Sequence, residues 1–176
     1  KDPSHPKSLH NVSSGTLHNW KCNFLAENEY LQALQSIGGI LQYYDSDNRI
    51  PIYGFGAKLP PYHNVVSHCF SLNGNYFDPE NDGLEEVIQV YKDRLKDIKF
   101  HGPTVFSEII HLAAEYAKSE SVDNENQKYY ILLIITDGNI NDFEATKDEV
   151  VLASELPLSI VIVGVGEERS FGKMDE

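Results

Sequence analysis

Two oxygen-bearing side chains stand at places in the sequence where binding or catalysis is common. Residues 129–135 form a run of aromatic and aliphatic side chains, and the run ends at Thr136 and Asp137. An acid at this position draws attention because open parallel sheets bind ligands at the carboxyl ends of their strands. The second candidate is Thr104, which follows a Gly-Pro turn at the start of a predicted helix.

Each of these residues also has an ordinary structural interpretation. Asp137 could bond to the amides of the following turn, and Thr104 could be the N-cap of its helix. Taken together, a carboxylate and a hydroxyl on loops at one sheet edge are hard oxygen ligands of the kind that suit Mg²⁺. The pair therefore predicts a divalent-cation site, with both structural alternatives open.

The elements that must position these two residues follow from the hydrophobic pattern. Apolar residues at spacings of three and four predict amphipathic helices, with Asn28 and Asp142 as possible N-caps. Short runs of β-forming residues and two continuous apolar runs predict strands. The expected helices cover residues 28–44, 82–98, 102–119 and 142–156, and the expected strands lie in 50–57, 65–72, 129–136 and 158–166.

This order of elements indicates an α/β domain. Continuous apolar strands that alternate with helices are typical of a mostly parallel sheet covered by helices on both faces. Residues 1–27 contain prolines and scattered polar residues with little periodicity, so we expect an irregular N-terminal segment there. The domain itself is expected to span residues 28–176.

Charge and cysteine content restrict the function further. The chain has 14 Lys and Arg against 27 Asp and Glu, a formal net charge of −13. Such a charge repels nucleic acid and anionic lipid and favours cations or basic partners. No apolar run approaches the roughly 20 residues of a membrane span. The two cysteines, Cys22 and Cys69, indicate reduced thiols in an intracellular protein.

Motifs for other chemistry are absent from the sequence. There is no phosphate-binding G-x-x-x-x-G-K-[ST] loop and no G-x-S-x-G nucleophile elbow, and no histidine or cysteine spacing indicates zinc. Asp45 and Asp47 resemble the start of an EF-hand loop, but Ile50 stands where that loop requires glycine. Cys69 is interpreted as a structural thiol. No catalytic residue is predicted, and a nucleophilic Asp137 would lack an accompanying base.

Several segments, in order and spacing, resemble the von Willebrand factor A domain of copines. The resemblance is carried by NEYLQAL (28–34), YDSDNRIPIYGFGAKLPP (44–61), GPT (102–104), LLIITDG (132–138) and LPLSIVIVGVG (156–166). It implies a doubly wound, Rossmann-like sheet with a metal-ion-dependent adhesion site, where Thr104 and Asp137 hold Mg²⁺ or Mn²⁺. The first strand, its D-x-[ST]-x-S loop and the C-terminal elements of the family are expected to be missing from this chain. Asp2-x-Ser4 is a superficial match to that loop.

The resemblance also implies a function. It suggests a non-enzymatic protein–protein interaction module of a copine, which binds intracellular proteins through an acidic side chain at the metal. C2 domains outside this chain would bind phospholipid when Ca²⁺ rises. The full-length protein would then be cytoplasmic, recruited to the plasma membrane by calcium, and would act in membrane trafficking or signalling. The alternative is the substrate-recruiting, copine-like A domain of a RING-type E3 ubiquitin ligase.

Overall fold

The computed structural model describes residues 8–10, 28–61, 64–119, 127–138 and 140–166. The helices are α1 (Glu29–Leu41), α2 (Gly83–Arg94), α3 (Ser107–Ser119) and α4 (Phe143–Ala153), and a 3₁₀ turn, η2 (Gln42–Tyr44), follows α1. The strands are β1 (Arg49–Pro51), β2 (Tyr53–Gly54), β3 (Ala57–Lys58), β4 (Val66–Ser67), β5 (Phe70–Ser71), β6 (Glu80–Asp82), β7 (Lys99–Phe100), β8 (Tyr130–Thr136) and β9 (Leu158–Gly164). The expected N-terminal segment 1–27 lies outside the described residues except for 8–10.

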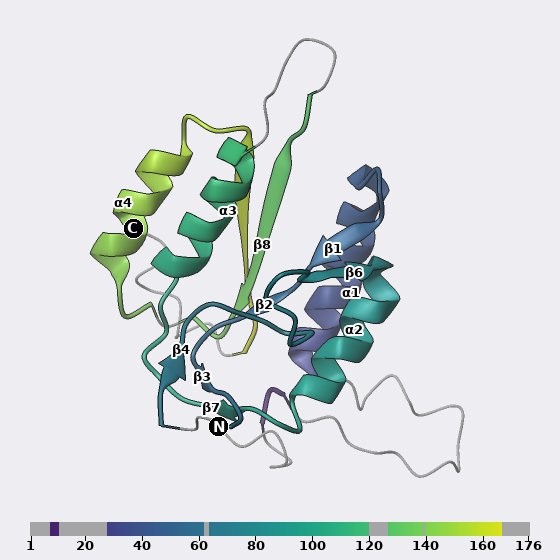
Figure 1. Cartoon of the computed structure of the whole chain (residues 1–176), viewed down its shortest axis with the longest axis vertical. Helices are drawn as coiled ribbons and strands as arrows, with labels where there is room; N and C mark the ends of the chain where they lie inside the picture. The colour runs from purple at the N-terminus through teal and green to yellow at the C-terminus, as the bar shows by residue number, and fades with distance from the viewer. Residues whose placement is uncertain (1–7, 11–27, 62–63, 120–126, 139, 167–176) are drawn as a thin grey trace.

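The centre of the domain is the parallel pair β8–β9. The two strands pair in register over their whole lengths, from Tyr130 opposite Leu158 to Thr136 opposite Gly164. Helices α3 and α4 lie side by side on one side of this pair, and α1 and α2 lie on the other (Figure 1). A mixed α/β architecture is therefore confirmed.

The remaining strands are short and antiparallel. They form the pairs β1–β6 and β2–β5 and the three-stranded sheet β4–β3–β7. The prediction of one strand over residues 65–72 is wrong, because β4 and β5 belong to different sheets. The chain bends between them, where the Ser67 hydroxyl donates to the Cys69 carbonyl at 3.2 Å. Such local side-chain bonds compete with a continuous strand.

Two apolar clusters hold these elements together. The larger one joins α3, α4 and the β8–β9 pair around Phe106, Ile110 and Ile134, which are nearly or fully buried. The other cluster lies under the short antiparallel strands and includes Phe70, Leu72, Leu95 and Ile98.

Burial of the parallel pair β8–β9 is incomplete, contrary to the expectation of a sheet covered by helices on both faces. Ile131 is 42% exposed, Val161 36% and Ile162 44%. Continuous apolar strands are normally covered on both faces. In the part of the chain that the structure describes, part of this apolar surface faces solvent.

Candidate functional site

Asp137 stands on a tight turn that Thr136 fixes at the carboxyl end of β8. Thr136 is 1% exposed, its carbonyl accepts the amide of Val165 at 2.8 Å, and its hydroxyl accepts the amide of Gly138 at 3.3 Å. Gly138 has a φ of 102°, a conformation that favours glycine. These bonds leave Asp137 half-buried at the end of the strand, where the sequence predicted it.

The loop that carries Thr104 is bound to the segment that follows Asp137. The Thr104 amide donates to the Asn141 side-chain oxygen at 2.7 Å, and the Asn141 amide donates to the Thr104 carbonyl at 2.9 Å. Because Asn141 follows Asp137 closely in sequence, this pair of hydrogen bonds joins the two loops of the predicted site. Asn141 is a positioning residue that the sequence did not identify.

Asp142 makes a second tie between the same two segments. It stands directly before α4, as predicted for an N-cap, but its side chain makes no cap bond to α4. Its carboxylate instead accepts the amides of Phe106 at 3.1 Å and Ser107 at 2.9 Å, at the start of α3. Asp142 therefore occupies the predicted N-cap position of α4, but its carboxylate accepts amides at the start of α3. The sequence signal, a polar Asn-Asp pair after a strand, did not show which helix it would serve.

Hydrogen bonding also sets the charge state of Asp142. Partial burial raises the pKa of this carboxyl, but the bonds from the Ser107 and Phe106 amides lower it more, so the pKa lies below its ordinary value. A carboxylate is favoured at this place because the N-terminus of a helix carries a partial positive charge. Asp142 is thus an ionised structural anchor beside the Thr104 loop.

The carboxyl end of β9 is tied to the start of α1. The amide of Gly166 donates to the Glu29 carboxylate at 2.6 Å. Glu29 lies in the first turn of α1, whose N-cap Asn28 accepts the Leu31 amide at 2.8 Å, as the sequence predicted. Glu29 is therefore a carboxylate at the β9 end of the sheet edge that sequence analysis did not assign to the site.

The donor set at this edge can be compared with the needs of a divalent cation. Thr104 and Asp137 offer oxygen atoms, which fit a hard ion such as Mg²⁺ in type. Their number falls short of the octahedral shell that Mg²⁺ requires. Within the described residues, no group of three or more His, Cys, Asp or Glu is arranged to hold a metal ion. The oxygen atoms of Thr104 and Asp137 are therefore of the right type for Mg²⁺, but they would supply only part of its coordination shell.

Other candidates from the sequence have structural roles. The Asp47 carboxylate accepts the Arg49 amide at 3.1 Å, which lowers the pKa of Asp47 and is typical of a turn. Cys69 is half-buried, and burial, followed by the nearby Glu108 charge, raises the pKa of its thiol to about 11. A thiol with a raised pKa is a poor nucleophile. Asp2, Ser4 and Cys22 lie outside the described residues.

Comparison with known proteins decides the family. The family model for copines matches residues 16–176, which is most of the chain. The chain belongs to the copine family. Two similar proteins are BONZAI 2 and BONZAI 1 of Arabidopsis thaliana, which are 45% and 46% identical to this copine chain over 166 residues. That alignment covers 94% of the chain and 26% of each relative, so the chain spans about a quarter of their length.

Proposed function

We propose that this copine chain is a non-enzymatic protein-interaction module with the von Willebrand factor A fold. Its partner-binding site would be the sheet edge where Thr104 and Asp137 meet a Mg²⁺ or Mn²⁺ ion. The observation that carries the proposal is the paired hydrogen bond between Thr104 and Asn141, at 2.7 and 2.9 Å. It holds the hydroxyl-bearing loop against the segment that carries the carboxylate.

The fold supports this proposal in two ways. The β8–β9 pair is parallel and has helices on both sides, which is the local arrangement of a doubly wound sheet (Figure 1). Exposed apolar side chains on the pair, among them Ile131 and Ile162, are also what a larger sheet would cover. The proposed site then lies where such sheets bind ligands, at the carboxyl ends of the strands.

The roles of the individual residues follow from their positions. Asp137 would supply a negative oxygen and Thr104 a neutral one, and the ion would screen a partner's carboxylate from the chain's net charge of −13. Remaining ligands would come from water, from the partner, or from residues beyond these two. Asn141 and Asp142 would hold the Thr104 loop in place without binding the ion. In the full-length copine, C2 domains would supply the calcium-dependent contact with phospholipid.

The site is tested by titrating the chain with Mn²⁺ and measuring the free ion by electron paramagnetic resonance. We expect Asp137→Ala and Thr104→Val to weaken Mn²⁺ binding, because each removes an oxygen ligand. Thr104→Ser keeps the hydroxyl and should bind as the unaltered chain does. Equal Mn²⁺ affinity in all four proteins would contradict the metal site.

The interaction role requires a second measurement. A random peptide library is selected on the chain in Mg²⁺, and the enriched peptides are compared with and without EDTA. We expect enriched peptides to contain an essential Asp or Glu, and we expect EDTA and Asp137→Ala each to abolish their binding. Peptides that bind equally well in EDTA, or equally well to the Asp137 variant, would show that this edge does not recognise partners through an ion.

A further inference from the structure

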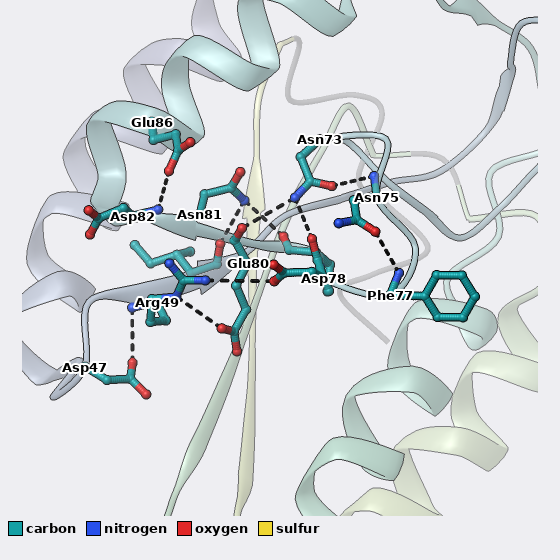
Figure 2. Close-up of polar contacts among 12 residues, drawn as sticks. Asp47, Arg49, Asn73, Asn75, Phe77, Asp78, Glu80, Asn81, Asp82 and Glu86 are labelled. Carbon is teal, nitrogen blue, oxygen red and sulfur yellow. Dashed lines mark hydrogen bonds and ion pairs between the residues drawn. The ribbon is translucent and has the colours of Figure 1, made fainter.

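The loop between β5 and β6, residues 72–79, is cross-linked by hydrogen bonds from its own side chains, and we call it the aromatic loop. The side-chain oxygen of Asn73 accepts the Asn75 amide at 2.8 Å, and its side-chain nitrogen donates to the carbonyls of Asp78 at 2.8 Å and Glu80 at 3.4 Å. Figure 2 shows these bonds crossing the loop. One asparagine therefore links the beginning of the loop to its end.

Helix α2 supports the aromatic loop from the other side. The Arg94 guanidinium donates to the Leu72 carbonyl at 2.6 Å. Gly74 has a φ of 82°, a backbone conformation that other residues rarely adopt, so this position favours glycine. The loop is thus held at both ends and at its turn. A surface that is already ordered loses little conformational entropy when it binds a partner.

The tip of this ordered loop presents two aromatic rings to solvent. Tyr76 is 78% exposed and Phe77 is 95% exposed, and their rings meet edge to face with centroids 5.7 Å apart. The Phe77 amide donates to the Asn75 side chain at 3.2 Å, and its ring points away from the polar network (Figure 2). Burying a phenylalanine side chain contributes about 1.5–3 kcal/mol. Rigid exposed aromatic residues are frequent anchors of protein interfaces.

Acidic side chains flank the aromatic pair. Asp78 and Glu80 are well exposed, and both lie near Arg49, at 3.8 Å and 3.2 Å. Asp82 on β6 and Glu86 on α2 lie in the same region (Figure 2), which adds negative charge beside the Arg49 ion pairs. This charge attracts Lys and Arg side chains and repels anionic lipid and nucleic acid. The surface therefore favours a polypeptide partner over a membrane.

We propose that the aromatic loop is a docking surface for a basic polypeptide segment. An apolar side chain of the partner packs against Tyr76 and Phe77, and neighbouring Lys or Arg side chains pair with Asp78 and Glu80. The surface is distinct from the proposed metal site and contains none of its ligands. Binding there is independent of divalent cations.

The test selects a random dodecapeptide library on the chain in EDTA, with counter-selection against the double variant Tyr76→Ser/Phe77→Ser. We expect the enriched peptides to have a net positive charge around an apolar core. In fluorescence anisotropy, Phe77→Ser should weaken the binding of these peptides at least tenfold, which corresponds to about 1.4 kcal/mol. Tyr43→Ser, which removes a 90% exposed aromatic outside the loop, is the matched control and should change nothing.

Charge variants test the second half of the proposal. Asp78→Asn/Glu80→Gln should weaken the basic peptides and reduce their salt dependence, whereas Arg49→Gln should strengthen them. Asp137→Ala should have no effect, which separates this surface from the proposed metal site. Enrichment of neutral or acidic peptides, or binding unaffected by Phe77→Ser, would overturn the proposal. So would Phe77-dependent binding to phosphatidylserine vesicles without peptide binding, which would assign the loop to a membrane.

Discussion

Replacement of Asp142 by alanine tests the tie between the loops of the proposed site. The carboxylate binds the amides of Phe106 and Ser107 at 3.1 and 2.9 Å, so the substitution leaves both amides without this acceptor. Loss of an N-capping side chain costs about 0.5–2 kcal/mol. A partly buried amide that loses its acceptor adds about 1 kcal/mol. We therefore expect Asp142→Ala to lower the free energy of unfolding by about 1.5–3 kcal/mol.

Asp142→Asn is the matched control for this substitution. Asparagine keeps an acceptor oxygen and caps helices as well as aspartate does. It loses only the interaction between the negative charge and the helix dipole, which contributes about 0.3–1 kcal/mol. The asparagine variant should thus be more stable than the alanine variant by about 0.5–2 kcal/mol, the cost of losing a capping side chain.

The effect of Asp142 should also depend on pH. Its pKa is lowered in the folded chain, mainly by amide hydrogen bonds that outweigh the opposing effect of burial. Stabilisation by a group with a lowered pKa is fully present above the unfolded-state value of about 3.9. It is lost as the pH falls through the lower folded-state value. The difference between the unaltered chain and Asp142→Asn should therefore shrink in acid.

Urea unfolding followed by far-ultraviolet circular dichroism at neutral pH and near pH 3 measures these differences. Thermal unfolding provides a second readout, since each kcal/mol shifts Tm by roughly 2–4 °C in a chain of this size. Equal stability of the alanine and asparagine variants would refute the role given to the carboxylate. The unaltered chain and Asp142→Asn should differ less in their free energy of unfolding near pH 3, where aspartate becomes protonated. A difference that stays constant down to this pH would refute the role given to the charge of Asp142.

Three further substitutions or conditions test other parts of the structure. The His10 ring stacks on Tyr30 and Phe100, with ring centroids 4.0 and 4.3 Å apart, and its Nδ1 forms a hydrogen bond with the Tyr91 hydroxyl at 2.9 Å. His10→Ala should therefore lower the free energy of unfolding in urea by about 1–3 kcal/mol. Ile110→Val removes one methylene from a fully buried position, and calorimetry should show a loss of about 0.5–1.5 kcal/mol. In a Cys22→Ser background, Cys69 should react slowly with a disulfide reagent at pH 8, with a rate that rises nearly tenfold per pH unit toward its pKa of about 11.

Local patterns predicted much of this fold because local interactions determine those parts of it. The predicted helix 28–44 corresponds to α1 and η2, and Asn28 caps it by a bond to a nearby amide. The apolar run 129–136 corresponds to β8, and 158–166 to β9. In each case periodicity, strand composition and a cap are properties of consecutive residues. They can be read without knowledge of the partners in space.

The remainder depended on contacts between distant segments. Asp142 was recognisable as a cap, but the amides that donate to its carboxylate lie more than thirty residues earlier, at the start of α3 rather than in α4. The bend between β4 and β5 carries a side-chain hydrogen bond from Ser67 to the Cys69 carbonyl, which β propensity does not predict. Exposure of Ile131 depends on what packs beside β8 and not on its own composition. For the site, sequence placed Thr104 and Asp137 on separate loops, whereas only the structure showed what joins those loops.

The double tie made by Asn141 and Asp142 has a mechanical consequence. Because these neighbours bind the main chain at Thr104 and at the beginning of α3, a displacement of the segment after β8 would be transmitted to the first turn of α3. A ligand that pulled on this edge would tilt the whole helix, which is about 20 Å long. The displacement would be carried along α3 to its C-terminal end, where the Tyr116 hydroxyl forms a hydrogen bond with the Tyr53 hydroxyl at 2.8 Å.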